Sequence, residues 1–471
     1  MNKFIKNAST LMFANVISFL ISTLITLIVP KSISVLDYSY FQLYLFYINY
    51  LGFFCIGWID GIVLRYSGGY YSGLDRSVFS RQYRLYSYLE LFFSVLIVSS
   101  SLILHLEANR RVVYIAVGIA LYLNQANAFF RFLRQAVNDI DIYAKNVMQE
   151  KLIYLLGVVF SLLIGKFSFL YLIIADLIGK FFSLIHILIL NKDIVLAEPV
   201  SIIEGVTEAK NNISVGIKLL LANGSSMLIV GIIRYSIQSN WDIETFGRVS
   251  LSLSISNMFI LFVQAVGVSL FPMLKRIEVD KIVSLYKKLR KVLTLVMFSL
   301  LSVYYPMYLM LAYWLPSYSK SLKYAAIMFP VCIYESKMQL LIEPYMKALR
   351  KESRLLFGNI IAVILSFLSS LVFAFVLDNL DYVILSLVII LAIRSIILEI
   401  EVEKKLNINI RFDVMSELIM TFLFIVFNWY LGGWSGFCAY LIAVVIFWII
   451  EKKSVELIFR MAIDFLKIKN K

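Results

Sequence analysis

Long apolar runs alternate with short polar stretches along the whole chain of 471 residues. A helix that crosses a membrane needs about 20 mostly apolar residues. Fourteen segments have this character, and since the fifth and the last two are short, twelve spans is the alternative. They cover residues 10–30, 41–64, 85–106, 112–134, 152–165, 167–190, 213–235, 249–271, 292–315, 324–346, 355–377, 382–400, 414–431 and 436–450.

Composition agrees with this pattern. Apolar and aromatic residues make up 61% of the chain, charged residues only 16%, and the mean hydropathy is +0.85. A soluble domain carries about 25% charged residues, so the chain has the composition of a membrane protein. We therefore predict an all-α, polytopic integral membrane protein.

The positive charges indicate an orientation. With the N-terminus in the cytoplasm and the spans alternating, 32 of the 44 lysines and arginines fall on the cytoplasmic side, 7 fall outside and 5 lie deeper. Cytoplasmic loops of membrane proteins carry an excess of Lys and Arg. We expect both termini to be cytoplasmic, and the placement of the net charge of +14 in loops argues against nucleic-acid binding.

The loops also divide the chain. The longest polar stretch, residues 191–212, follows the sixth span and is predicted to link two halves, while the C-terminal tail has the helical apolar–basic pattern of a segment on the inner leaflet. The predicted parts are an N-terminal lobe (1–205), a C-terminal lobe (206–400), and two extra spans with the amphipathic tail (401–471).

A faint internal repeat relates the two halves at an offset of 208 residues. LMFANVISFLISTLI (11–25) aligns without a gap on LLLANGSSMLIVGII (219–233), including the Ala-Asn pair and the serine that follows. Both stretches begin on odd-numbered spans, so the halves would share one orientation, as in some transporters.

Charges inside predicted spans are the candidate functional residues, because a buried charge costs about 2.5–3.5 kcal/mol on insertion scales and is therefore usually paired or functional. Asp60 and Arg65 lie near the cytoplasmic end of the second span, in GWIDGIVLRYSGGYYSGLD. They are about 140° apart around a helix, so each is expected to have a partner elsewhere or, for Arg65, to reach the headgroups. The alternative for Arg65 is a side chain that faces a cavity.

Two further candidates lie in spans six and seven. Asp176 and Lys180 have the i,i+4 spacing of a pair within one helix. Arg234 is at the outer end of the seventh span, after a small polar patch at residues 223–226, and either reaches the outer headgroups or faces a cavity.

The tenth span is the most polar. Glu335, Gln339 and Glu343 lie along one stripe of the helix, and Lys337 points about 160° away from it. We expect this helix to line a water-filled cavity. Arg394 and Glu399 in the twelfth span are expected to lie at the cytoplasmic interface.

Enzyme chemistry has no support in the sequence. Neither histidine, at 105 or 186, has a second histidine or a cysteine at metal-ligand spacing, and HExxH, GxSxG and GKS/T motifs are absent. A membrane glycosyltransferase or polymerase needs a sizeable outer loop for its acceptor, and the predicted outer loops are short. We therefore expect a carrier with no metal and no cofactor, coupled if at all to H⁺ or Na⁺.

The order of motifs in roughly the first 280 residues is informative. A basic N-terminus leads into NASTLMFANVISFLISTLITLIVP, then GWIDGIVLRYSGGYYSGLD, ISVGIKLLLANGSSMLIVGIIRYSI and VGVSLFPMLKR. This order resembles the Wzx-type oligosaccharide flippases, the polysaccharide-transport family of the multidrug/oligosaccharidyl-lipid/polysaccharide (MOP) exporter superfamily. The rest of the chain matches mainly in its number of spans.

The resemblance implies a MATE-like fold of two six-helix lobes around a central cavity in the bacterial inner membrane. It implies a flippase that moves undecaprenyl-pyrophosphate-linked repeat units of O-antigen, capsule or exopolysaccharide to the outer leaflet by alternating access. Membrane lipids, a polysaccharide polymerase and chain-length proteins are the implied partners. By position, Arg65, Arg234 and Lys337 would neutralise the pyrophosphate, with Asp60 and Glu335 beside them.

Two other interpretations stay open. One is a cation-coupled antiporter of drugs or small molecules on the same fold, in which Asp60, Asp176, Glu335 or Glu343 would bind the ion. In either transporter, Asp176, Lys180 and Glu343 could instead form structural pairs. The other is a membrane enzyme of polysaccharide assembly.

Overall fold

The computed structural model describes residues 2–165, 167–274, 279–452 and 455–456. All regular structure in these ranges is helical, which confirms the all-α prediction. The chain divides into two compact units, Met1–Gly224 and Ser225–Lys471. Most of the predicted amphipathic tail lies outside the described residues.

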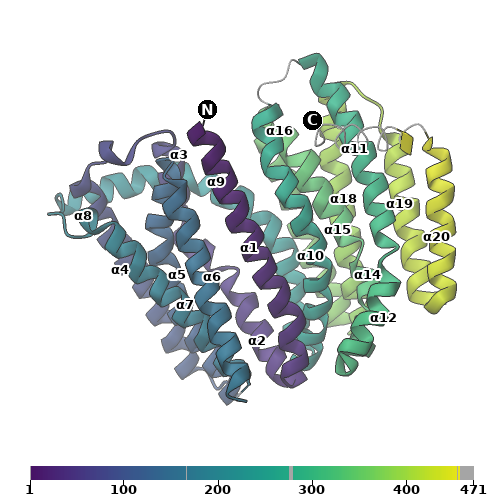
Figure 1. Cartoon of the computed structure of the whole chain (residues 1–471), viewed down its shortest axis with the longest axis horizontal. Helices are drawn as coiled ribbons and strands as arrows, with labels where there is room; N and C mark the ends of the chain where they lie inside the picture. The colour runs from purple at the N-terminus through teal and green to yellow at the C-terminus, as the bar shows by residue number, and fades with distance from the viewer. Residues whose placement is uncertain (1, 166, 275–278, 453–454, 457–471) are drawn as a thin grey trace. The chain divides into compact units, whose positions relative to one another are not determined.

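Unit 1 is built from long helices joined by short turns, and Figure 1 follows them in chain order. Its elements are α1 (Asn2–Ser32), α2 (Val35–Ile48), the 3₁₀ turn η1 (Leu51–Cys55), α3 (Trp58–Tyr66), η2 (Tyr71–Gly73), α4 (Arg76–Ile103), α5 (Ala108–Ala136), α6 (Ile140–Leu163), α7 (Phe169–Leu190), the short α8 (Lys192–Val195) and the first part of α9 (Ile202–Asn240).

Unit 2 takes the end of α9 and the remaining helices (Figure 1). They are α10 (Ile243–Leu274), α11 (Val279–Leu301), α12 (Tyr304–Trp314), η3 (Pro316–Tyr318), α13 (Ser319–Leu322), α14 (Ala325–Met328), α15 (Val331–Lys337), the π-helical η4 (Met338–Ile342), α16 (Glu343–Ala348), α17 (Glu352–Ser370), the π-helical η5 (Leu371–Val376), α18 (Leu380–Leu406), α19 (Arg411–Ile425), the π-helical η6 (Val426–Leu431) and α20 (Gly433–Ile450).

Several helix starts follow from local sequence. Ser34, Asp75 and Asn379 precede α2, α4 and α18, and each side chain accepts a hydrogen bond from a backbone N–H of the first turn. Such N-caps satisfy donors that have no partner within the helix.

Each of the fourteen apolar segments falls on one helix or on a series of adjacent helical elements. Among the described residues, ten helices are long and apolar enough to cross a membrane. The number rises to twelve if two bent pairs count as single spans: Val35–Cys55 with Trp58–Tyr66, bent by 60°, and Ile282–Leu301 with Tyr304–Trp314, bent by 41°. The chain is thus a multi-pass helical protein, and the total of fourteen or twelve spans stays a prediction.

The polar stretch 191–212 differs from the predicted linker. Residues 192–195 form α8, and α9 begins at Ile202, so the second half of the stretch is helical. The boundary between the units falls inside α9, between Gly224 and Ser225, rather than near residue 205. Polar residues in the first turns of α9 are explained by their contacts with α3, described below.

Helix boundaries agree with the internal repeat. The first helix ends at Ser32 and α9 ends at Asn240, while α2 begins at Val35 and α10 begins at Ile243. Both pairs of boundaries are offset by 208 residues, the offset that the sequence match indicates. The helix boundaries therefore support the internal repeat.

The second predicted span breaks at Ile56 and Gly57, both of which have positive φ (51° and 80°). The short helix α3 then packs on α9 through small residues. A Cβ at Gly61 would overlap the backbone carbonyl of Asn212, and one at Gly216 would overlap the carbonyl of Gly57. GWIDG is therefore a small-xxx-small motif that lets two helix backbones meet.

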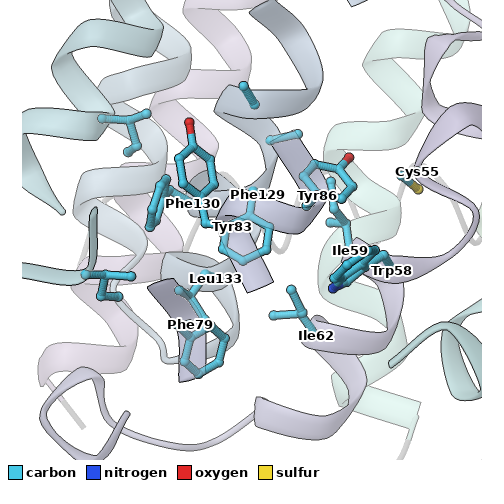
Figure 2. Packing of buried hydrophobic residues seen from close by; sticks show 14 of the residues in the cluster. Cys55, Trp58, Ile59, Ile62, Phe79, Tyr83, Tyr86, Phe129, Phe130 and Leu133 are labelled. Atoms are coloured by element: carbon cyan, nitrogen blue, oxygen red, sulfur yellow. The ribbon is translucent and has the colours of Figure 1, made fainter. Parts of the chain in front are cut away.

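An aromatic core surrounds this contact. Figure 2 shows Trp58, Ile59 and Ile62 of α3 facing aromatic side chains of α4 and α5. Trp58 meets the ring of Tyr86 edge to face, with 5.5 Å between the centroids. Its indole N–H donates to Gln82, which also accepts from the Asn212 amide at 2.6 Å. This core and the glycine contact fix α3 and the start of α9 in unit 1.

We predict that Gly61→Leu destabilises unit 1, because its side chain must displace the α9 backbone. Overpacking of this kind costs about 1–3 kcal/mol, or more where backbone has to move. The thermal midpoint of the purified protein in detergent measures the loss. Gly73→Leu is the matched control, since a side chain there meets open space; equal midpoints for the two variants would contradict the proposed packing.

Candidate functional site

A buried network of charges joins four helices of unit 1. Lys180 of α7 donates to both oxygens of Asp176 at 2.7 Å and approaches Glu150 of α6 at 3.5 Å. Glu150 also binds Arg131 of α5 at 2.6 Å, and the Tyr44 hydroxyl of α2 donates to Asp176 at 2.6 Å. The predicted contact between Asp176 and Lys180 is present, within a larger assembly.

Two cations and two carboxylates make this network neutral. An ion taken out of water costs several kcal/mol, and its partners recover that cost only when the geometry is good and the remaining lone pairs are bonded. Here every charged group contacts an opposite charge. The network is thus suited to holding α5, α6 and α7 together inside an apolar surrounding.

Unit 2 contains a second buried network, which also has two cations and two carboxylates at its centre. Lys337 of α15 donates to Glu399 of α18 at 2.9 Å and to Glu417 of α19 at 2.7 Å. Arg290 of α11 donates to the same Glu399 at 2.6 Å and to Glu417 at 3.4 Å. All four residues are almost fully buried.

The second network continues toward α20. The Tyr286 hydroxyl donates to Glu399 at 3.0 Å. At the other side, Asp413 lies 3.7 Å from Arg290 and 3.1 Å from Lys291, and Lys291 also pairs with Glu451 at the end of α20. Both C-terminal helices are thereby tied by charge to α11.

The structure corrects two predictions here. Lys337 lies in a packed ion cluster rather than on the wall of a water-filled cavity. Glu399, expected at the interface, is 0% exposed. Arg290 and Glu417 were missed. Glu417 lies inside the predicted segment 414–431, where the same cost argument applies, whereas Arg290 lies just before the segment 292–315.

A third charge cluster lies on the other face of the tenth predicted span, the span that also carries Lys337. Arg394 donates to Glu335 at 2.9 Å and to the Asn359 side chain at 2.8 Å, and Glu343 lies 3.8 Å from it. Glu343 also accepts from Lys347 one turn away, at 3.3 Å. The predicted stripe of Glu335 and Glu343 exists, but it faces an arginine that is 1% exposed instead of an interface or open water.

Arg65 and Asp60 do not pair with each other. Arg65 donates to Glu208 at 2.8 Å and to the Asn212 side chain at 2.7 Å, both on α9. Asp60 lies in the first turn of α3, where the helix dipole favours an anion, and accepts a weak hydrogen bond from the Cys55 thiol at 3.8 Å. Arg65 therefore reinforces the glycine contact between α3 and α9.

Arg234 is partly buried near the end of α9. Its guanidinium donates to the Ser250 hydroxyl at 3.0 Å and lies over the Phe246 ring, 5.3 Å from the centroid. Both partners belong to α10 of the same unit. Across the described part of the chain, no three His, Cys, Asp or Glu side chains gather as metal ligands.

The glycine-rich turn after α3 is held by a polar clamp. Arg134 lies over the Tyr71 ring at 3.4 Å and donates to Asn191 and Asp139, each at 2.8 Å. The Tyr71 hydroxyl donates to Asp193 at 2.8 Å. Burial raises the pKa of Tyr71, and the Asp193 carboxylate acts in the same direction, so the hydroxyl stays a neutral donor.

Among the comparisons with known proteins, only the comparison with solved structures found matches. No protein-family model matches the chain, and no curated protein sequence matches it. A solved structure of the lipid II flippase MurJ, in an inward closed conformation, matches with a TM-score of 0.64 and 13% identity. The match covers 94% of this chain and 99% of that one.

Two conformations of a multidrug resistance MATE family transporter of the MOP superfamily also match. Its outward-facing structure has a TM-score of 0.55 and 12% identity, covering 85% of this chain and 96% of that chain. The inward-facing structure has a TM-score of 0.55 and 11% identity, covering 83% and 98%. At such identities the likeness concerns the fold alone, and the predicted MATE-like fold is confirmed.

We predict that Lys337→Met severely destabilises unit 2, since it leaves Glu399 and Glu417 with one cation between them in the core of the network. Removing one partner of a buried pair costs about 3–5 kcal/mol. The double change Lys337→Met/Glu417→Leu keeps the Arg290–Glu399 pair and removes one charge of each sign, so it should recover much of that loss. Thermal unfolding in detergent measures both; a double variant no more stable than the single one would show that charge balance is not what the network provides.

Proposed function

We propose that this chain is a flippase that moves a polyprenyl-pyrophosphate-linked oligosaccharide, the repeat unit of an O-antigen, capsule or exopolysaccharide, from the cytoplasmic to the outer leaflet. The observation that carries the proposal is the extent of the structural likeness. The lipid II flippase structure matches 94% of this chain, whereas the two MATE structures match 85% and 83%. More of the chain has a counterpart in the transporter of a lipid-linked sugar.

The task makes a specific demand on cations. A pyrophosphate that leaves water for the interior of a membrane protein must be neutralised, and guanidinium groups do this with two parallel hydrogen bonds. Arg131, Lys180, Arg290, Lys337 and Arg394 are already matched with carboxylates inside the units. Recruiting any of them would break a buried ion pair, so they are poor candidates for the pyrophosphate.

Arg65 and Arg234 are the other two cations singled out in the sequence for the pyrophosphate, and both have partners within their own units. Arg65 is engaged by Glu208 and Asn212 in the contact between α3 and α9, which gives it a positioning role. Arg234 is partly accessible and has the Ser250 hydroxyl beside it, a donor that can join a guanidinium in binding a phosphate oxygen. We therefore assign the pyrophosphate contact to Arg234.

Binding of lipid probes to the purified protein tests this assignment. Undecaprenyl pyrophosphate should raise the thermal midpoint more than undecaprenol does, because only the former carries the anionic group. In Arg234→Gln the difference between the two lipids should largely disappear, a loss of about 1.5–3 kcal/mol for a charged hydrogen bond.

Lys210→Gln is the control, since it removes a positive charge from an exposed position of the same helix. This variant should keep the full difference between the lipids. If Arg234→Gln also keeps it, Arg234 does not contact the pyrophosphate. If the wild-type protein responds alike to both lipids but is stabilised by organic cations, the drug antiporter becomes the better interpretation.

A further inference from the structure

Glu90 is an unusual carboxyl in unit 1. It lies within α4 and is 0% exposed, and neither of its carboxyl oxygens has a hydrogen-bond partner among the described residues. The two other buried acids of this unit's core, Glu150 and Asp176, each contact a lysine or an arginine. Nothing in the ion networks described above involves Glu90.

A chain of hydrogen bonds begins one turn before Glu90. The Tyr86 hydroxyl donates to the side-chain oxygen of Gln125 on α5 at 3.2 Å. The Gln125 amide in turn donates to the backbone carbonyl of Leu51, at the start of the 3₁₀ turn η1. This turn comes directly before the break at Ile56 and Gly57, so the chain of hydrogen bonds connects Tyr86 to the bend. Figure 2 shows Tyr86 close to Trp58, which begins the helix after the break.

Other ionisable groups near Glu90 supply no positive charge. From the bent span the thiol of Cys55 and the carboxyl of Asp60 interact electrostatically with this region. From α5, Tyr122 is hydrogen-bonded to Ser87 at 3.0 Å. The two arginines of α4 that are nearest to Glu90 in the sequence bind elsewhere: Arg81 and Arg84 donate to the backbone carbonyls of Val200 and Ala197.

The short helix α8, which also packs on α4, directs its charge elsewhere. Its Asp193 pairs with Arg76 at 3.3 Å and accepts from Tyr71. An ionised Glu90 would therefore be a buried anion without a counter-ion. Such a state costs far more than a neutral carboxylic acid, which can also act as a donor.

We propose that Glu90 is a proton-binding site that controls the bend between η1 and α3. With the proton bound, the carboxylic acid can donate to the Tyr86 oxygen while Tyr86 donates to Gln125, and every donor in the chain points toward Leu51. On release, the proton passes to water, and the resulting carboxylate becomes the better acceptor for the single Tyr86 proton. Gln125 then loses its donor, and the hold on the bend weakens.

The consequence for transport rests on the proposed function. A proton that fixes a bent span in one form and loosens it on leaving is a means of coupling the transport cycle to a proton gradient. The site differs from the pairs that the sequence indicated for ion coupling, Asp176 with Lys180 and Glu343, because those carboxylates already hold fixed cations.

Infrared spectroscopy of the purified full-length protein tests the bound proton without any substrate. At neutral pH the wild-type protein should show the C=O stretching band of a protonated carboxylic acid that Glu90→Gln lacks. Glu198→Gln, at an exposed position in the loop before α9, should leave the band unchanged. An identical carboxylic acid region in wild type and Glu90→Gln would overturn the proposal.

Labelling of the Cys55 thiol tests the bend, because Cys55 ends η1 and is buried. In a background of Cys332→Ser and Cys438→Ser, a maleimide should label Cys55 about threefold or more faster with Glu90 present than with Glu90→Gln in mildly alkaline buffer. In mildly acidic buffer the two rates should be equal. An ionised Glu90 would by itself disfavour the Cys55 thiolate and slow labelling of the wild-type protein, so faster labelling reports the bend and not the ionisation of the thiol.

Tyr86→Phe provides a second variant in case Glu90→Gln does not fold. Tyr86→Phe keeps the Glu90 carboxyl and removes the hydroxyl that connects this carboxyl to Gln125. The infrared band should therefore persist. Labelling of Cys55 should lose its dependence on pH, apart from the part that comes from ionisation of the thiol itself. Labelling that follows pH alike in wild type, Glu90→Gln and Tyr86→Phe would overturn the link to the bend. These results stand apart from the lipid-binding test, so failure of this proposal and failure of the flippase proposal can be told apart.

Discussion

Every charge inside the apolar interior of this protein has to be neutralised by the protein itself, and the remaining features depend on how that is done. Each unit uses two cations and two carboxylates: Arg131 and Lys180 with Glu150 and Asp176, and Arg290 and Lys337 with Glu399 and Glu417. The four charges come from three helices in unit 1 and from four helices in unit 2. Because breaking any pair strands a buried ion, these networks fix which helices stay together within a unit.

This constraint also limits where function can lie. Cations that balance internal carboxylates are not available to a pyrophosphate. Arg234 is the proposed contact because its guanidinium is partly accessible beside the Ser250 hydroxyl, and Arg65 is assigned a positioning role. Conversely, a carboxyl without a cation is the place where a proton can be bound and released, and Glu90 meets that description among the described residues. The glycine contact of Gly57, Gly61 and Gly216 adds the second constraint, since it holds the helix after the bend against α9.

Local features of the sequence predicted the structure well. Apolar runs placed the helices, and i,i+4 spacing identified the Asp176–Lys180 contact, because both depend on residues close together in the chain. Helical periodicity also separated the face of Glu335 from that of Lys337. Glu335 pairs with Arg394 and Lys337 pairs with Glu399, and each partner lies about 60 residues away in the sequence. The burial of these pairs depends on how the helices of unit 2 pack, and a single sequence does not give that packing.

The break in the second span was missed for a related reason. Ile56 is an apolar residue inside an unbroken apolar run, so its positive φ leaves no mark on the hydropathy pattern. The packing role of GWIDG was likewise not visible in the sequence, because it depends on the facing residues, Asn212 and Gly216.

The central claim, that this fold carries a lipid-linked sugar across the bilayer, is tested most directly in vesicles of defined lipid that contain the purified protein. A fluorescent undecaprenyl-pyrophosphate-linked oligosaccharide is placed in both leaflets, and an impermeant reductant is added outside. The account predicts that the protein exposes the inner-leaflet pool to the reductant, whereas empty vesicles keep it protected. A protected pool in protein-containing vesicles that do exchange an organic cation across the bilayer would contradict it.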